Sequence, residues 1–198
     1  NYLMNFFSNS KSLGILGGGQ LGKMLLYVTR KWDIKTYVLD PNEDCPAKLA
    51  CNFFFKGDLS DFDTVYKFGK QVEILNIEIE NVNVEALEKL EKEGVRVFPQ
   101  SNVIKTIKNK CVQKKFFEKN KIPTSNFNTY KNIDQIKKDL INKKIAFPFI
   151  WKSAVSGYDG YGVKVIYSEK DIESLSEQES LVEEFIKIEK ELAVIVSR

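Results

Sequence analysis

Short apolar runs alternate with segments of helical periodicity through the first hundred residues, and this rhythm limits the fold more than any other feature of the chain. Apolar runs of strand length occupy residues 13–16, 36–39, 53–55, 72–79 and 95–98. Between them, apolar residues recur every three or four positions, as at Leu21, Met24, Leu25 and Val28. Strands that alternate with helices in this way form a parallel sheet with helices on both faces. We therefore predict an α/β fold with a Rossmann-like parallel sheet over residues 1–100.

The pattern changes after Pro99. Residues 101–119 show helical spacing throughout, and a second helix is predicted over 133–141. Shorter apolar segments predict strands at 127–130, 149–152, 163–167, 181–184 and 192–196. This mixture predicts a small α+β unit over residues 101–182. The last two predicted strands have no visible partners, so residues 183–198 are expected to begin a further domain that the chain does not complete.

The composition narrows the chemistry that the chain could perform. Among its 198 residues there is no histidine, which removes the commonest general base and the commonest zinc ligand. Any reaction must therefore rest on carboxylates, lysines and backbone amides. The net charge is small, 30 − 27 = +3. A group of lysines at positions 105, 108, 110, 114 and 115 indicates a solvated helix face and no nucleic-acid partner, although Lys108 or Lys110 could turn inward to a phosphate.

The cysteines and the hydropathy pattern indicate the cellular compartment in which the chain is expected. Cys45, Cys51 and Cys111 are odd in number and form no C-x-x-C pair, as expected of free thiols in a reducing environment. No run of 18 apolar residues predicts a membrane span. Residues 1–10 lack the basic start and apolar stretch of a signal peptide. We therefore expect a cytoplasmic protein.

A first glycine-rich loop, Gly17-Gly18-Gly19-Gln20-Leu21-Gly22, fits the pattern G-x-G-x-x-G between a predicted strand and a predicted helix. Such a loop turns tightly and presents free backbone N–H groups to an anion. Asp40 ends the next predicted strand, where an NAD-binding Rossmann protein holds the ribose. An NAD(P)-dependent oxidoreductase is therefore one hypothesis. The other interpretation of the loop is a tight turn that packs a helix on the sheet.

Glu78 and Glu80 follow the fourth predicted strand. In a sheet with strand order 3-2-1-4, the ends of strands 1 and 4 flank the crevice where ligands bind. The Gly17 loop and Glu78 are therefore expected to face each other across one cleft. Carboxylates there would suit the hydroxyls or the amine of a small phosphorylated ligand. The alternative is that both acids are surface charges.

A second glycine-rich loop, Gly157-Tyr158-Asp159-Gly160-Tyr161-Gly162, follows a predicted strand that ends at Lys152. A loop of this kind can fold over a triphosphate and hold its oxygens with backbone N–H groups, while the lysine supplies a point charge. The segment from Leu181 to Ile186, with Glu191 after it, has the form of a strand that reads an adenine edge and a ribose. The alternative for the loop is a mobile hairpin beside a surface lysine.

Several stretches carry a family resemblance. The segments LGILGGGQLGKML, NIEIENVNVEAL, SGYDGYGVKV and VEEFIKIEKELAVIVSR resemble the 5-(carboxyamino)imidazole ribonucleotide synthases, a family of ATP-grasp ligases. The resemblance implies a pre-ATP-grasp domain at 1–100, an ATP-grasp lid domain at 101–182 and the start of a truncated C-terminal ATP-grasp domain at 183–198. It also implies ATP-dependent carboxylation of 5-aminoimidazole ribonucleotide with bicarbonate, through carboxyphosphate, in purine biosynthesis. ATP and Mg²⁺ would be required, and the full-length protein would be a homodimer.

The resemblance also assigns roles to residues. For ATP binding it implies Lys110, Lys152, Gly157, Tyr158, Asp159, Gly160, Tyr161, Gly162, Val163, Glu183, Glu184, Phe185, Ile186 and Glu191. For the ribonucleotide it implies Gly19, Gln20, Leu21, Glu78 and Glu80, and for catalysis Lys152, Tyr158 and Asp159. The metal ligands of the family are expected outside this chain, so the fragment is expected to be inactive alone. A nucleotide-binding module without catalysis remains the other alternative.

Overall fold

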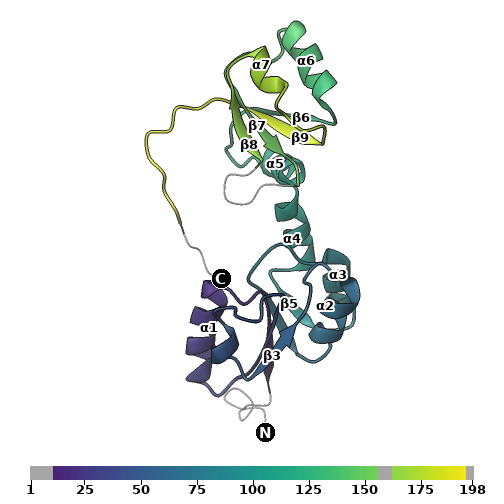
Figure 1. Cartoon of the computed structure of the whole chain (residues 1–198), viewed down its shortest axis with the longest axis vertical. Coiled ribbons are helices and arrows are strands. Elements are labelled where there is room, and N and C mark those ends of the chain that lie inside the picture. Colours follow the sequence, from purple (N-terminus) through teal and green to yellow (C-terminus); the bar gives the residue numbers. More distant parts are fainter. Residues whose placement is uncertain (1–10, 156–161, 195–198) are drawn as a thin grey trace. The chain divides into compact units, whose positions relative to one another are not determined.

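The structure, a computed structural model, describes residues 11–155 and 162–194 (Figure 1). The chain divides into two compact units, Asn1–Lys108 and Asn109–Arg198. Within the described residues, no helix has both the length and the apolar character needed to cross a membrane.

The first unit is a parallel sheet with helices on both faces. Its strands are β1 (Ser12–Leu16), β2 (Lys35–Asp40), β3 (Phe53–Lys56), β4 (Ile74–Ile77) and β5 (Arg96–Phe98). Its helices are α1 (Gln20–Arg30), the 3₁₀ turn η1 (Lys48–Ala50), α2 (Phe62–Gly69), α3 (Val84–Lys92) and α4 (Ser101–Lys108). The strand order β3-β2-β1-β4-β5 confirms the predicted parallel sheet.

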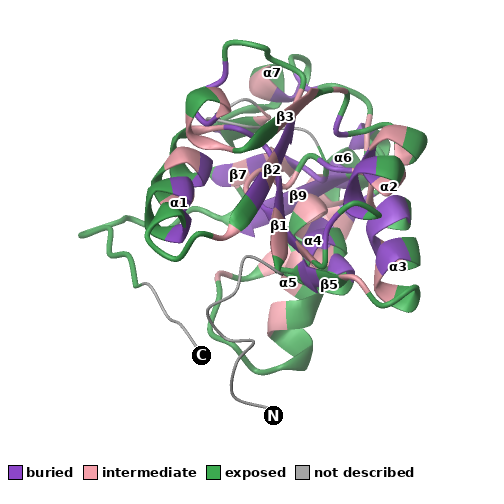
Figure 2. Ribbon diagram, turned by 90° about the horizontal axis from the view of Figure 1, so that it is seen from below, coloured by how far each residue is buried: buried purple, intermediate pink, exposed green. Residues whose placement is uncertain are grey.

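Alternate residues of the central strands serve two separate cores. Ile15 and Val38 pack with Leu26 of α1 on one face. Leu16 and Leu39 pack on the other face, with residues of α2 and α3. Figure 2 shows that the buried residues concentrate in the strands and on the inner sides of these helices. In the register, Leu16 lies opposite both Leu39 and Ile77. The carboxyl ends of β1, β2 and β4 therefore meet at one edge of the sheet, where ligands bind in folds of this class.

The second unit contains a four-stranded antiparallel sheet with the order β6-β9-β7-β8. Its elements are α5 (Lys110–Lys119), β6 (Phe127–Tyr130), α6 (Ile133–Ile141), β7 (Phe149–Ser153), β8 (Val163–Ile166), α7 (Glu169–Ile172) and β9 (Ser180–Glu184). Phe149 and Trp151 pack with Ile136 of α6 and Ile172 of α7 on one face. On the other face, Leu181 packs with Cys111 of α5. Figure 1 shows α6 and α7 on one side of the sheet and α5 on the other.

Three expectations for this part of the chain were wrong. Residues 101–119 do not form one helix, because the Asn109 backbone is extended (φ −122°, ψ 110°) and its side chain accepts the N–H groups of Cys111 and Val112. The strand at 181–184 does have partners, since β9 pairs with both β6 and β7. No strand forms over 192–194, the described part of the predicted strand 192–196.

Candidate functional sites

The first candidate site is the Gly17 loop at the carboxyl end of β1. Gly17 has φ +97°, a backbone conformation that side chains disfavour. Its N–H donates to Leu39 O at 3.0 Å, and Gly18 O accepts the N–H of Ala47 at 2.9 Å. The carbonyl of Gly19, the residue before α1, then accepts the N–H of Lys23 at 3.0 Å in the first turn of that helix. The loop is therefore fixed by backbone contacts on both sides before any ligand binds.

Glu78, the first residue after β4, lies directly against this loop. Its backbone N–H donates to Leu16 O at 2.9 Å, which places it beside β1. A Cβ added to Gly17 would lie 2.8 Å from Glu78 Oε2, and one added to Gly19 would collide with Oε1. Within the described residues, no hydrogen bond or ion pair engages the Glu78 carboxylate. The prediction that the loop and Glu78 face each other is thus confirmed, and the glycines leave room for this carboxylate.

Asp40 has a structural role that argues against the NAD hypothesis. Its Oδ2 accepts the N–H of Gly18 at 2.6 Å, and its Oδ1 accepts the N–H of Asn42 at 2.7 Å. A carboxylate that binds the ribose of NAD must have free oxygens, and a pyrophosphate needs the N–H groups of the glycine loop. Here Asp40 occupies one of those N–H groups, and Glu78 places a negative charge beside the loop. The geometry therefore favours a ligand that offers hydrogen-bond donors to the loop region.

The second candidate site lies on the face of the small sheet that α5 covers. Ile150 of β7 is opposite Glu183 of β9, and Lys152 is opposite Leu181, so Lys152 and Glu183 are diagonal neighbours on one face. Lys152 Nζ lies 2.6 Å from Glu183 Oε2. The sequence predicted both residues as ATP ligands, and the structure brings their side chains together.

A third charged residue, Lys114 of α5, completes this cluster. Its Nζ lies 2.7 Å from Glu183 Oε1. The sequence placed Lys114 on a solvated face, and this was wrong because its side chain is only 13% exposed. Lys108 does turn inward, but its Nζ donates to Val82 O within the first unit. The available signal for Lys114 was its spacing of three residues from Cys111, which puts both on one side of a helix.

The environment of Glu183 sets its charge. Burial by itself raises the pKa of Glu183, but hydrogen bonds and attraction from Lys114 and Lys152 outweigh it and hold the pKa below its usual value of 4.5. The cluster therefore contains one carboxylate and two ammonium groups, with a net charge of +1. A surplus cation on a partly open sheet face is suited to binding an anionic group such as a phosphate.

Four other residues that were predicted as ATP ligands also lie in the second unit. Lys110 begins α5, and its N–H donates to Ala154 O at 2.8 Å, immediately after β7. Gly162 has φ +82°, and its carbonyl accepts the N–H of Ser153; Val163 pairs with Lys152. The Glu184 carboxylate accepts the backbone and side-chain N–H groups of Asn126.

Phe185, Ile186 and Glu191 are exposed and lie after β9, outside any helix or strand. In the first unit, Gln20 and Leu21 open α1 with exposed side chains, and Glu80 lies in the loop after β4. Gly157, Tyr158, Asp159, Gly160 and Tyr161 lie outside the described residues.

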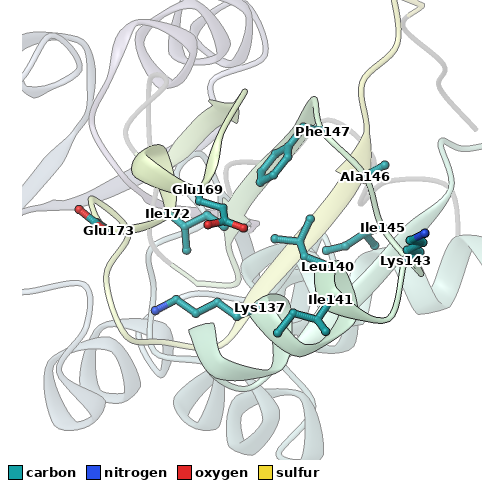
Figure 3. A pocket seen from close by; sticks show the side chains of 10 residues that line it. All are labelled: Lys137, Leu140, Ile141, Lys143, Ile145, Ala146, Phe147, Glu169, Ile172 and Glu173. Atoms are coloured by element: carbon teal, nitrogen blue, oxygen red, sulfur yellow. The ribbon is translucent and has the colours of Figure 1, made fainter.

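Two cavities of the second unit differ in their relation to this cluster. A hollow of about 350 Å³ adjoins the end of β9 and includes Asn126, Glu183 and Glu184 in its lining. A larger, more apolar cavity of about 660 Å³ lies between α6 and α7, as Figure 3 shows. Its lining, which includes Leu140 and Phe147, contains none of the predicted site residues that the structure describes.

Comparison with known proteins gives matches over both units. Residues 10–108 match the ribonucleotide synthetase preATP-grasp domain, and residues 115–198 match the ATP-grasp domain. Phosphoribosylaminoimidazole carboxylase of Vigna aconitifolia is 35% identical over 94% of this chain and 34% of its own length.

Two solved structures resemble most of the chain. The N5-carboxyaminoimidazole ribonucleotide synthetase of Thermotoga maritima has a TM-score of 0.80 at 31% identity, over 90% of this chain and 47% of the other. The Aspergillus clavatus N5-carboxyaminoimidazole synthase, in complex with ADP and 5-aminoimidazole ribonucleotide, has a TM-score of 0.79 at 28% identity, over 91% and 48%. The chain thus spans about half the length of these structures.

Proposed function

The chain belongs to the ribonucleotide synthetase preATP-grasp family, and we propose that it forms the ribonucleotide-binding and ATP-binding part of an ATP-dependent carbon–nitrogen ligase. The reaction is the carboxylation of 5-aminoimidazole ribonucleotide with bicarbonate in purine biosynthesis. The observation that carries the proposal is the surplus cation Lys152, on the strand that leads into a glycine-rich loop. The names of the relatives supply the substrate class.

In this proposal the second unit binds ATP. The Lys152 ammonium is fixed on a strand and offers its charge to the phosphates. Phosphorylation of bicarbonate gives carboxyphosphate, whose phosphate is a good leaving group when the substrate amine attacks the carboxyl carbon. Transfer of the phosphoryl group depends mainly on positioning and on charge stabilisation, which is the role proposed for Lys152. Tyr158 and Asp159 stay sequence predictions for the amine and its proton.

The first unit binds the ribonucleotide in this proposal. Glu78 lies beside Gly17 and Gly19 and has no hydrogen-bond or ion-pair partner among the described residues, so it suits ribose hydroxyls or an amine. A phosphate would be repelled by this carboxylate, so the proposal places the phosphate of the ribonucleotide away from Glu78. Gln20 and Leu21 are the predicted neighbours of the same ligand.

The proposal assigns no step to Mg²⁺ in this chain. Over residues 11–155 and 162–194, no three acidic or cysteine side chains come together in a group that could hold a metal ion. We also propose a homodimer in a reducing, cytoplasmic compartment. The free thiols of Cys45 and Cys111, both buried, support the compartment.

ADP binding to the chain, measured by calorimetry, tests the ATP-binding part. Lys152→Met should raise the Kd by about 10- to 100-fold, the usual effect of losing one charge-assisted contact. Lys164→Met is the matched control, because Lys164 lies on the adjacent strand β8 and bonds to Ser174 O. Equal affinities of the wild-type chain and Lys152→Met would contradict the assignment of Lys152.

Binding of 5-aminoimidazole ribonucleotide tests the other part. Glu78→Gln should weaken binding by about tenfold, because a charged acceptor becomes a neutral one. Glu73→Gln is the control, since Glu73 precedes β4 and pairs with Lys11 on the surface. If the two variants bind the ribonucleotide equally well, the substrate site is not at Glu78.

A further inference from the structure

Two lysines share one carboxylate in the second unit, each with its own oxygen. Lys114 approaches Oε1 of Glu183 from α5, at 2.7 Å. Lys152 approaches Oε2 from β7, at 2.6 Å. Since one carboxylate balances only one ammonium group, one of the two lysines is in excess electrostatically.

The contacts of the two lysines show which one is in excess. Lys114 also donates to Ser125 Oγ at 2.9 Å and to Thr124 Oγ1, and its side chain is 13% exposed. Lys114 is thus held by two hydroxyl acceptors as well as by its ion pair with Glu183. The Lys152 side chain is 27% exposed, and within the described part of the chain Glu183 is its one partner. Lys152 is therefore the lysine that can leave the cluster.

We propose that Lys114 is a positioning residue that holds the Glu183 carboxylate, so that Lys152 can leave it for a nucleotide phosphate. The inference rests on the proposed function of Lys152. Glu183 is buried, and a buried carboxylate left without a partner is strongly unfavourable. With Lys114 in place, the departure of Lys152 leaves Glu183 paired. Without Lys114, Lys152 must serve both Glu183 and the phosphate, and the two anions compete for one cation.

Calorimetric titration of the chain with ADP distinguishes this role from a merely structural one. Lys114→Met should raise the Kd by about tenfold. In a Glu183→Gln background, Lys114→Met should change the Kd by less than about threefold, because the neutral amide no longer competes for Lys152. The control Lys115→Met removes an exposed charge from the same helix and should leave the Kd unchanged. A loss of affinity of about tenfold on adding Lys114→Met to Glu183→Gln would overturn the proposal.

Unfolding of the second unit gives a second test that needs no nucleotide. In a Trp32→Phe background, the buried Trp151 is the remaining tryptophan, and its fluorescence reports this unit. Lys114→Met should lower the unfolding midpoint by roughly 8 °C and Lys152→Met by less than half of that, because Lys114 is the more deeply buried of the two partners of Glu183. The reverse order would refute the inference.

A wild-type chain that does not bind ADP would contradict the proposed ATP site. The order of the two unfolding midpoints would still decide whether Lys114 holds Glu183. If the methionine variant does not fold, Lys114→Gln keeps a hydrogen-bond donor and allows the same comparison.

Discussion

Alanine at Gly17 should destabilise the first unit far more than alanine at Gly94, although the two glycines have similar positive φ angles. Gly17 has φ +97° and Gly94 has φ +91°. A side chain in this region costs about 1–2 kcal/mol through backbone strain alone. Gly94→Ala should show only this term, since no atom of the described residues lies within 4 Å of an added Cβ.

Gly17→Ala adds a steric term that can be worked out from the structure. The added Cβ would lie 2.7 Å from Ile79 Cγ2, 2.8 Å from Glu78 Oε2 and 3.2 Å from Ile79 N. One of these neighbours is backbone, so rotation of side chains cannot relieve every contact. Overpacking of this kind costs about 1–3 kcal/mol. The total for Gly17→Ala is then about 2–5 kcal/mol.

Hydrogen exchange of backbone amides in β1 and β4, followed in increasing urea, measures the stability of the first unit separately from the second. The expected difference between the two variants is about 1–3 kcal/mol. Gly17→Ala should also weaken binding of 5-aminoimidazole ribonucleotide, because Glu78 must move, whereas Gly94→Ala should not. Equal destabilisation of the two variants, within about 0.5 kcal/mol, would refute the steric reasoning.

Two further predictions concern the second unit. Folding lowers the pKa of Glu183, so its ionised carboxylate stabilises the folded chain above the unfolded pKa of about 4.5, and this stabilisation is lost as the pH falls through the folded value. Glu183→Gln should reduce this acid-induced loss of stability, followed by Trp151 fluorescence, and an unchanged profile would contradict the assignment. Asn109→Ala should destabilise α5 by about 1 kcal/mol, because it removes the acceptor of two N–H groups; unchanged amide protection in α5 would show that this cap is not needed.

The first unit could be predicted from the sequence because its determinants are local. Each strand is a short, largely apolar run, each helix has its own periodicity, and parallel connections allow few orders of strands. The meeting of Glu78 with the Gly17 loop follows from that order alone. What the sequence did not show was the use of Asp40, since a carboxylate that accepts loop N–H groups and one that accepts ribose hydroxyls occupy the same position in the pattern.

The structure of the second unit was harder to predict, because it depends on contacts between residues far apart in the sequence. Antiparallel pairing between β9 and its neighbours joins residues far apart in the chain, so no local pattern places β9 inside the sheet. The break at Asn109 arises because its short side chain bonds to nearby backbone N–H groups in competition with the helix. The inward direction of Lys114 depends on which side of α5 packs on the sheet, and this is a tertiary property.

A carboxylate near the end of a strand favours different ligand groups in the two units, because its partners differ. Glu183 is paired with two lysines, so the surroundings of this acid are positive and suit a phosphate. Glu78 has no such partner among the described residues and lies against a glycine loop, so it makes a motif associated with phosphate binding into a site for hydrogen-bond donors. If the proposed function holds, Glu78 in the first unit should contact hydroxyl or amine groups of its ligand, and Lys152 in the second unit should contact phosphates.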